Sequence, residues 1–112
     1  MWTPKTEDEI LAAMAGGDLH ETASFEAKRQ LPEKNRNIDL AIDVAAMSTD
    51  GGVVIYGLDE DENHFVTTIS PIPLAGTRER ISSIIQSSVS EVPSFSVVSI
   101  QSTKDPSIGY IQ

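Results

Sequence analysis

The stretch GGVVIYGL, residues 51–58, constrains the fold of this chain more than any other. Its apolar run is too short for a typical helix, is rich in β-branched residues and is bounded by glycines, a pattern that predicts a buried strand. The polar sequence DEDEN, residues 59–63, then predicts a turn, and HFVTTIS, residues 64–70, predicts a returning strand. The middle of the chain is therefore expected to form a hairpin.

Helical patterns flank this hairpin along the chain. Apolar residues recur at helical spacing in residues 6–14, 38–48 and 77–90. Residues 24–31 alternate between apolar and polar side chains, as in a strand with one polar face, and further strands are expected in residues 94–102 and from Tyr110 onward. Interspersed helices and strands predict an α/β or α+β fold, in which two to three helices pack on a mixed sheet.

Two threonines stand where helix caps are expected. Thr6 is followed by Glu9 three residues later, which is the spacing of a capping box. Gly16 and Gly17 then predict the end of that helix. Thr77 is a candidate cap for the third helix.

Composition excludes several classes of protein and site. The 112 residues suit one domain, and the absence of cysteine rules out a disulfide framework, a thiolate metal site and a cysteine nucleophile. No apolar run approaches the roughly 18 residues of a membrane span. The N-terminal sequence has no basic region followed by an apolar block, so it is not a secretory signal. We expect a cytoplasmic protein that does not associate with membranes.

The net charge and the local distribution of charge favour different interpretations. A formal net charge of −9 argues against unspecific binding to nucleic acid, because phosphate contacts need lysine and arginine. However, four basic residues fall within nine positions of one another. They form either an ordinary solvated surface or a local patch that faces phosphate. These residues are Lys28, Arg29, Lys34 and Arg36.

Three carboxylates are candidates for chemistry, and each also has an ordinary interpretation. Glu26 and Lys28 share a face of their strand, where they form either a metal-ligand and phosphate pair or an exposed ion pair. Glu21 reaches Glu26 only if the chain bends, and is otherwise a solvated loop residue. Asp59 follows the buried strand, at the kind of position where sites form, or belongs to a solvated acidic turn.

Other sites receive less support from the sequence. His20 and His64 have no partner at metal-ligand spacing, so we interpret them as surface or edge residues, and Glu60 is assigned to the solvated turn. The sequence TDGG, residues 49–52, lacks the Gly-Lys-Ser/Thr ending of a phosphate loop. We therefore expect no nucleotide or organic cofactor.

Three blocks together resemble the Schlafen Alba-like domain family. ETASFEAK, residues 21–28, is similar to the family's Glu-Ser-x-x-x-Glu-x-Lys, and AAMSTDGG, residues 45–52, to its helix end Ala-Phe-Ala-Asn-Thr-x-Gly-Gly. VVIYGLDE, residues 53–60, is similar to its apolar strand ending in Gly-Val-Asp-Asp. The matching residues are Glu21, Glu26, Lys28, Thr49, Gly51, Gly52, Gly57 and Asp59.

The resemblance implies an Alba-like fold and association with RNA or DNA. Some animal Schlafen proteins use this unit as a metal-dependent endoribonuclease on structured RNA such as transfer RNA. Their acidic site would correspond here to Glu21, Glu26 and Asp59, which would hold Mg²⁺ or Mn²⁺, with Lys28 facing the phosphate. The four basic residues named above would contact nucleic acid.

The resemblance also implies a division of the chain and possible partners. Residues 1–18 would form an N-terminal helix and linker, and residues 19–112 a Schlafen Alba-like domain cut at its C-terminus from a longer protein. Animal members place two such units around the substrate, so we expect a homodimer or a partner domain in the same chain. Many bacterial members are described only as DNA-binding or transcription-regulator domains, which leaves open a non-catalytic binding or dimerisation module.

Overall fold

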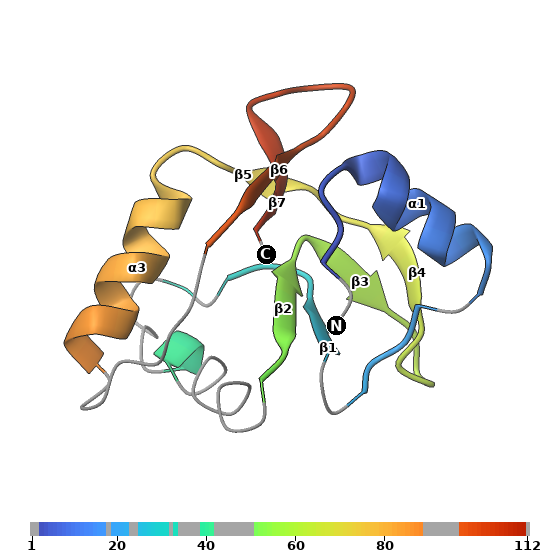
Figure 1. The fold of residues 1–112 in the computed structure, drawn as a ribbon, viewed down its shortest axis with the longest axis horizontal. Helices are drawn as coiled ribbons and strands as arrows, with labels where there is room; N and C mark the ends of the chain where they lie inside the picture. Colours follow the sequence, from blue (N-terminus) through green and yellow to red (C-terminus); the bar gives the residue numbers. More distant parts are fainter. Residues whose placement is uncertain are drawn as a thin grey trace.

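A computed structural model of the chain describes residues 3–17, 19–22, 25–31, 33, 39–41, 51–88 and 97–111. It confirms the predicted α+β class, with helices and a mixed sheet (Figure 1). Residues 39–41 are helical. The other elements are α1 (Glu7–Ala15), β1 (Phe25–Lys28), β2 (Val53–Tyr56), β3 (Leu58–Glu60), β4 (Val66–Ile69), β5 (Ile72–Pro73), α3 (Thr77–Ser88), β6 (Ser99–Gln101) and β7 (Ile108–Ile111).

Strand β7 holds the larger sheet together. It pairs antiparallel with β2, β5 and β6, while β1 pairs with β2 in parallel. The parallel pair is connected by the segment that contains the helical residues 39–41, as a parallel connection requires. Strands β3 and β4 form a separate antiparallel hairpin. The sequence predicts a hairpin between residues 51–58 and 64–70, but of the first segment only Leu58 pairs with β4, because residues 53–56 pair with β1 and β7.

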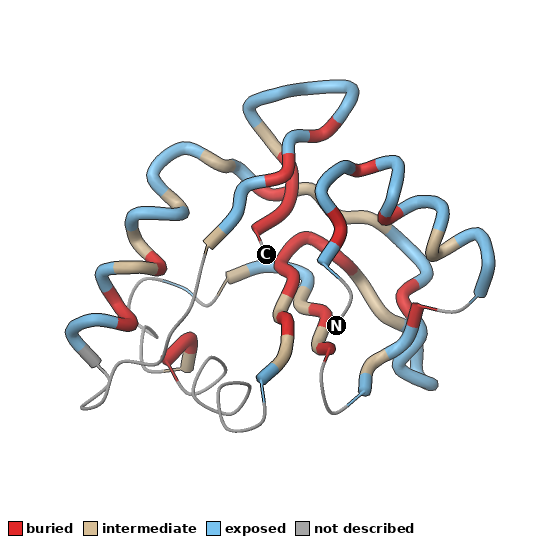
Figure 2. Tube along the Cα trace, in the orientation of Figure 1, coloured by how far each residue is buried: buried red, intermediate tan, exposed pale blue. Residues whose placement is uncertain are grey.

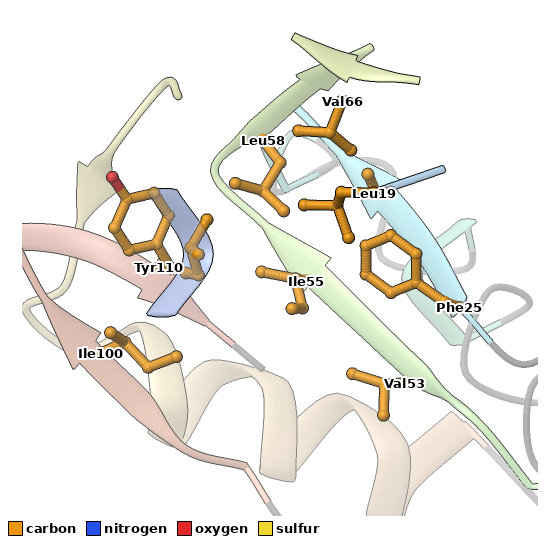
Figure 3. Close-up of a cluster of buried hydrophobic side chains, with 10 residues drawn as sticks. Leu19, Phe25, Val53, Ile55, Leu58, Val66, Ile100 and Tyr110 are labelled. Atoms are coloured by element: carbon orange, nitrogen blue, oxygen red, sulfur yellow. The ribbon is translucent and has the colours of Figure 1, made fainter. Parts of the chain in front are cut away.

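Both faces of the sheet are buried, and alternation along β2 divides its side chains between them. Val53 and Ile55 face a core shared with Ile10 of α1 and with Leu58 and Val66 of the β3–β4 hairpin (Figure 3). Val54 and Tyr56 face the opposite core, which includes α3 and the helical residues Leu40 and Ala41. A strand covered on both faces needs apolar residues at every position, which explains the unbroken VVIY sequence. Buried positions accordingly follow β2 and β7 through the middle of the molecule (Figure 2).

Helix α1 begins as predicted, with one difference in its capping box. The Thr6 hydroxyl accepts a hydrogen bond from the Glu9 backbone N–H at 3.2 Å. The Glu9 carboxylate accepts from the backbone N–H of Lys5 at 2.8 Å, and so satisfies the residue before the cap. Gly16 ends the helix, and Gly17 follows in the left-handed region with φ +71°.

A buried carboxylate fastens α1 to the β6–β7 hairpin. Glu7 is 3% exposed, and its Oε2 accepts a hydrogen bond from the Tyr110 hydroxyl at 2.7 Å. Its Oε1 accepts from the Thr103 hydroxyl at 2.9 Å. Since Ile10 lies in the same core as β1 and β2, α1 packs against the rest of the described chain.

Gly57 divides the predicted strand of residues 51–58 into two. Its φ of +111° lies where only glycine is comfortable, and a Cβ here would lie 2.7 Å from Cδ1 of Tyr110. Its N–H donates to the Lys28 carbonyl at 2.8 Å, and its carbonyl accepts from Ser70 N–H at 2.7 Å. The chain therefore leaves the large sheet at Gly57 and enters β3.

This break corrects several sequence predictions. Asp59 and Glu60 belong to β3, so the predicted turn over residues 59–63 begins two residues late, at Asp61. The predicted loop after β4 contains the short strand β5. Thr77 is the first residue of α3, and its hydroxyl donates to the Pro73 carbonyl at 2.9 Å, so it does not precede the helix as a cap. The predictions for residues 42–50 and 89–96 lie outside the described residues.

No helix in the described part of the chain is long and apolar enough to cross a bilayer.

Candidate functional site

The tip of the β3–β4 hairpin positions two side chains of the candidate site. Asp61 organises the turn, because its Oδ1 accepts from the backbone N–H groups of Asn63 at 2.8 Å and Phe65 at 3.1 Å. The His64 N–H donates to the Asp61 carbonyl, which holds His64 in the left-handed region at φ 64°. In this conformation the His64 ring turns back toward Glu60, and its Nδ1 lies 3.4 Å from Glu60 Oε1.

Residues 19–22 place a third side chain beside the hairpin. His20 forms an antiparallel bridge with Phe65, and the Glu21 N–H donates to the His64 carbonyl at 3.0 Å. A tight reversal, in which Thr22 and Phe25 exchange backbone hydrogen bonds, then leads into β1. This is the bend that Glu21 needs in order to approach the strand.

The Glu21 carboxylate also completes the edge of β1. Because the Lys28 carbonyl bonds toward β2, the N–H of Ala27 points to the other side of β1. Glu21 Oε1 accepts a hydrogen bond from this N–H at 3.3 Å. Two hydrogen bonds therefore position Glu21, one from its backbone N–H to His64 and one to its carboxylate from Ala27.

Glu21, Glu60 and His64 converge on one point. One ligand atom from each lies within 4.8 Å of the others, and His64 Nδ1 is 3.7 Å from Glu21 Oε2. The two glutamates are partly buried, whereas the His64 side chain is 65% exposed. The site is therefore closed on the protein side and open to solvent at the imidazole.

The two carboxylates of this cluster raise the cost of ionising one another. Burial raises the pKa of the Glu21 carboxyl, and its contact with Glu60 and the nearby charge of Glu26 raise it further. Oε2 of Glu60 is buried and meets no hydrogen-bond donor among the described residues. Two carboxylates in contact need either a shared proton or a cation between them.

The donors present fit a divalent cation. Carboxylate oxygens and an imidazole nitrogen are ordinary ligands of divalent metals, and the exposed side of the cluster leaves room for water or substrate. Glu60 Oε1 is the carboxylate oxygen that faces His64 Nδ1, at 3.4 Å. Glu21, Glu60 and His64 are the residues that would hold the ion.

The structure brings together only part of the set predicted from the sequence. Glu26 lies near enough to Glu21 to affect its pKa, but its Oε1 binds Lys28 Nζ at 2.9 Å, which is the ion pair offered as the ordinary interpretation. Asp59 does not join the group that converges within 4.8 Å among the described residues. It precedes Glu60 in β3, so the two side chains point to opposite faces of the hairpin, and Glu60 takes the third position.

The predicted basic patch is described only in part. Lys28 is engaged with Glu26, and Arg29 is exposed just after β1. Lys34 and Arg36 lie outside the described residues.

The sequence pattern did not identify Glu60, which it assigns to a solvated turn, or His64, which it assigns to the surface or an edge. One signal could have identified them. The residues that flank a turn of polar residues lie close together when the turn closes, and Glu60 and His64 flank residues 61–63 in this way.

Comparisons with known proteins add no relative to these observations: no family model matches the chain, and no curated protein or solved structure matches it significantly.

Proposed function

We propose that this chain is a nucleic-acid-binding domain of the Schlafen type that cleaves structured RNA, such as transfer RNA, with the help of a divalent cation. The observation that supports this function most is the convergence of Glu21, Glu60 and His64 within 4.8 Å. The sequence resemblance supplies the substrate class, and the proposed location is the cytoplasm.

Each residue of the proposed site has a chemical role. Glu21, Glu60 and His64 would hold the cation, and a bound cation would supply an activated water and stabilise the negative charge on the phosphate. Lys28 Nζ lies 2.9 Å from Glu26 Oε1. In the proposed function, this ammonium group neutralises the charge of the phosphodiester when the RNA enters beside β1. Arg29, which is exposed, contacts the RNA backbone.

A cleavage assay tests this function. The purified chain is incubated with transfer RNA and with single-stranded DNA, with Mn²⁺ or with a chelator. We expect metal-dependent cleavage of RNA, which Glu60→Gln reduces by at least about 100-fold because a ligand and its charge are lost. Glu62→Gln is the matched control, since Glu62 is exposed in the neighbouring turn. Absence of cleavage at any protein excess, together with absence of Mn²⁺ binding, contradicts the proposal.

A non-catalytic DNA- or RNA-binding or dimerisation module of a bacterial transcription regulator is the second candidate. The exposed position of Arg29 beside Lys28 favours it. This function predicts binding without cleavage, which weakens as salt is added. Charge reversal at both residues should lower the affinity at low salt, and an unchanged affinity would count against this candidate. Light scattering measures whether the domain forms the expected homodimer.

A further inference from the structure

We infer that the cluster of Glu21, Glu60 and His64 selects a transition metal such as Mn²⁺ or Zn²⁺ over Mg²⁺. This inference rests on the proposed function, because it concerns the same site and specifies which class of ion the site takes. It follows from the set of donor groups, which consists of two carboxylates and one imidazole.

The imidazole is the donor that separates the two classes of ion. Mg²⁺ prefers an octahedral shell of oxygens, keeps several of its waters and is usually held by one or two carboxylates. Imidazole suits Zn²⁺ and other first-row transition metals, and affinity rises along that series from Mn²⁺. An ion that uses His64 Nδ1 at this site must accept nitrogen, so Mg²⁺ gains little from the third residue.

Backbone hydrogen bonds fix the main chain of His64 beside the two carboxylates. His64 sits at φ 64°, a left-handed conformation that is unfavourable for a non-glycine residue. Its N–H and carbonyl are both bonded, to Asp61 and to Glu21 respectively. Nδ1 already lies 3.4 Å from Glu60 Oε1 and 3.7 Å from Glu21 Oε2, so little rearrangement is needed to share one ion.

The positive φ of His64 also allows a substitution that removes the ring without disturbing the backbone. Glycine is comfortable at positive φ, so His64→Gly removes the ring while favouring the turn conformation. The matched control is His20→Gln, since His20 is also exposed and its ring lies next to that of Phe65, with ring centroids 5.1 Å apart. Circular dichroism verifies that both variants fold.

Calorimetric titration of the full chain with MgCl₂, MnCl₂ and ZnCl₂ tests the inference without any nucleic acid. We expect Mn²⁺ and Zn²⁺ to bind at least about tenfold more tightly than Mg²⁺. Since even outer-shell partners of a metal are worth about 10–100-fold in affinity, His64→Gly should lose at least tenfold for Zn²⁺ while Mg²⁺ changes little. His20→Gln should match the unmodified chain. As a second readout, Co²⁺ used in place of Zn²⁺ should give an absorption spectrum that changes on removal of His64.

Several results would overturn the inference. Equal affinities for Mg²⁺ and Mn²⁺, no binding of any of the three ions, or a selectivity that survives His64→Gly would each exclude a role for the imidazole. RNA cleavage with Mg²⁺ and no selectivity would overturn the inference but keep the proposed function. Selective binding through His64 without RNA cleavage would keep the inference and remove the proposed function.

Discussion

At the scale of single residues, Glu7 carries the clearest electrostatic consequence. Burial alone would raise the pKa of its carboxyl, but hydrogen bonds from Tyr110, Ser102 and Thr103 outweigh burial and place the pKa below its ordinary value of 4.5. Burial, together with the hydrogen bond to Glu7 and the charge of that carboxylate, raises the pKa of the Tyr110 hydroxyl, so this group stays protonated and remains a donor. The ionised carboxylate is therefore the form that the folded chain prefers.

Glu7→Gln should destabilise the fold by about 1–3 kcal/mol at neutral pH, because a charged acceptor of several hydrogen bonds is lost. A group with a depressed pKa stabilises the folded state above its unfolded-state pKa, and this contribution disappears as the pH falls through the folded-state pKa. The difference between the two proteins should therefore be largest near pH 7 and shrink below about pH 4.5. Urea unfolding of both proteins at about pH 7 and about pH 3.5 measures this difference in the free energy of unfolding.

Asp8→Asn is the control for this experiment. Asp8 occupies the same helical turn but is exposed, so its loss should cost only a few tenths of a kcal/mol through the helix dipole. If the stability cost of Glu7→Gln were the same at pH 3.5 and pH 7, the buried carboxylate would not be ionised in the folded state.

The site also illustrates which residues a sequence can and cannot identify. Glu21 is a candidate from the family resemblance, whereas its spacing from Glu26 leaves the bend toward β1 as one of two possibilities. The choice between Asp59 and Glu60 could not be anticipated, because it depends on the break at Gly57, where β2 ends and the separate strand β3 begins. A shift of one position sends a side chain to the other face of a strand, so a local backbone detail decides which acid reaches the site.

At the scale of elements, Gly57 determines where the β3–β4 hairpin departs from the sheet. Gly57→Ala should destabilise the fold by about 2–4 kcal/mol, because a positive φ of +111° and a contact of 2.7 Å with Tyr110 Cδ1 both oppose a methyl group. Thermal unfolding followed by circular dichroism measures the change.

Gly76→Ala separates the two causes. Gly76 also has a positive φ of +71°, but a Cβ there meets nothing within 4 Å, so only the conformational cost of about 1 kcal/mol applies. Equal effects of the two substitutions would show that Tyr110 does not crowd position 57.

Elements with a local cause were predictable, and elements fixed by distant partners were not. The start of α1 follows from Thr6 and Glu9, and the burial of alternate residues in β1 follows from its sequence. Strand β5, by contrast, consists of Ile72 and Pro73 and exists only because β7 passes beside it. No pattern within two residues could indicate that pairing.

At the scale of the whole molecule, α1 belongs to the same folded unit as the strands. Ile10 is 0% exposed, within a core that includes β1, β2 and β7. Ile10→Ala should therefore cost about 2–5 kcal/mol in the unfolding of the entire chain, measured by urea denaturation. Leu11→Ala is the control, because Leu11 is 37% exposed and its truncation should cost less than about 1 kcal/mol. A negligible effect of Ile10→Ala would instead support a separate N-terminal helix and linker in residues 1–18.

The central place of β7 has a consequence for how the protein is made. β7 leaves the ribosome after β2, β5 and β6, yet it pairs with all three. Synthesis proceeds at roughly 5–20 residues per second, so the edge of β2 that pairs with β7 stays unpaired for several seconds. Open strand edges of this kind invite association between nascent chains. The net negative charge of the sequence makes nascent chains repel one another, and so opposes this association before the chain has folded.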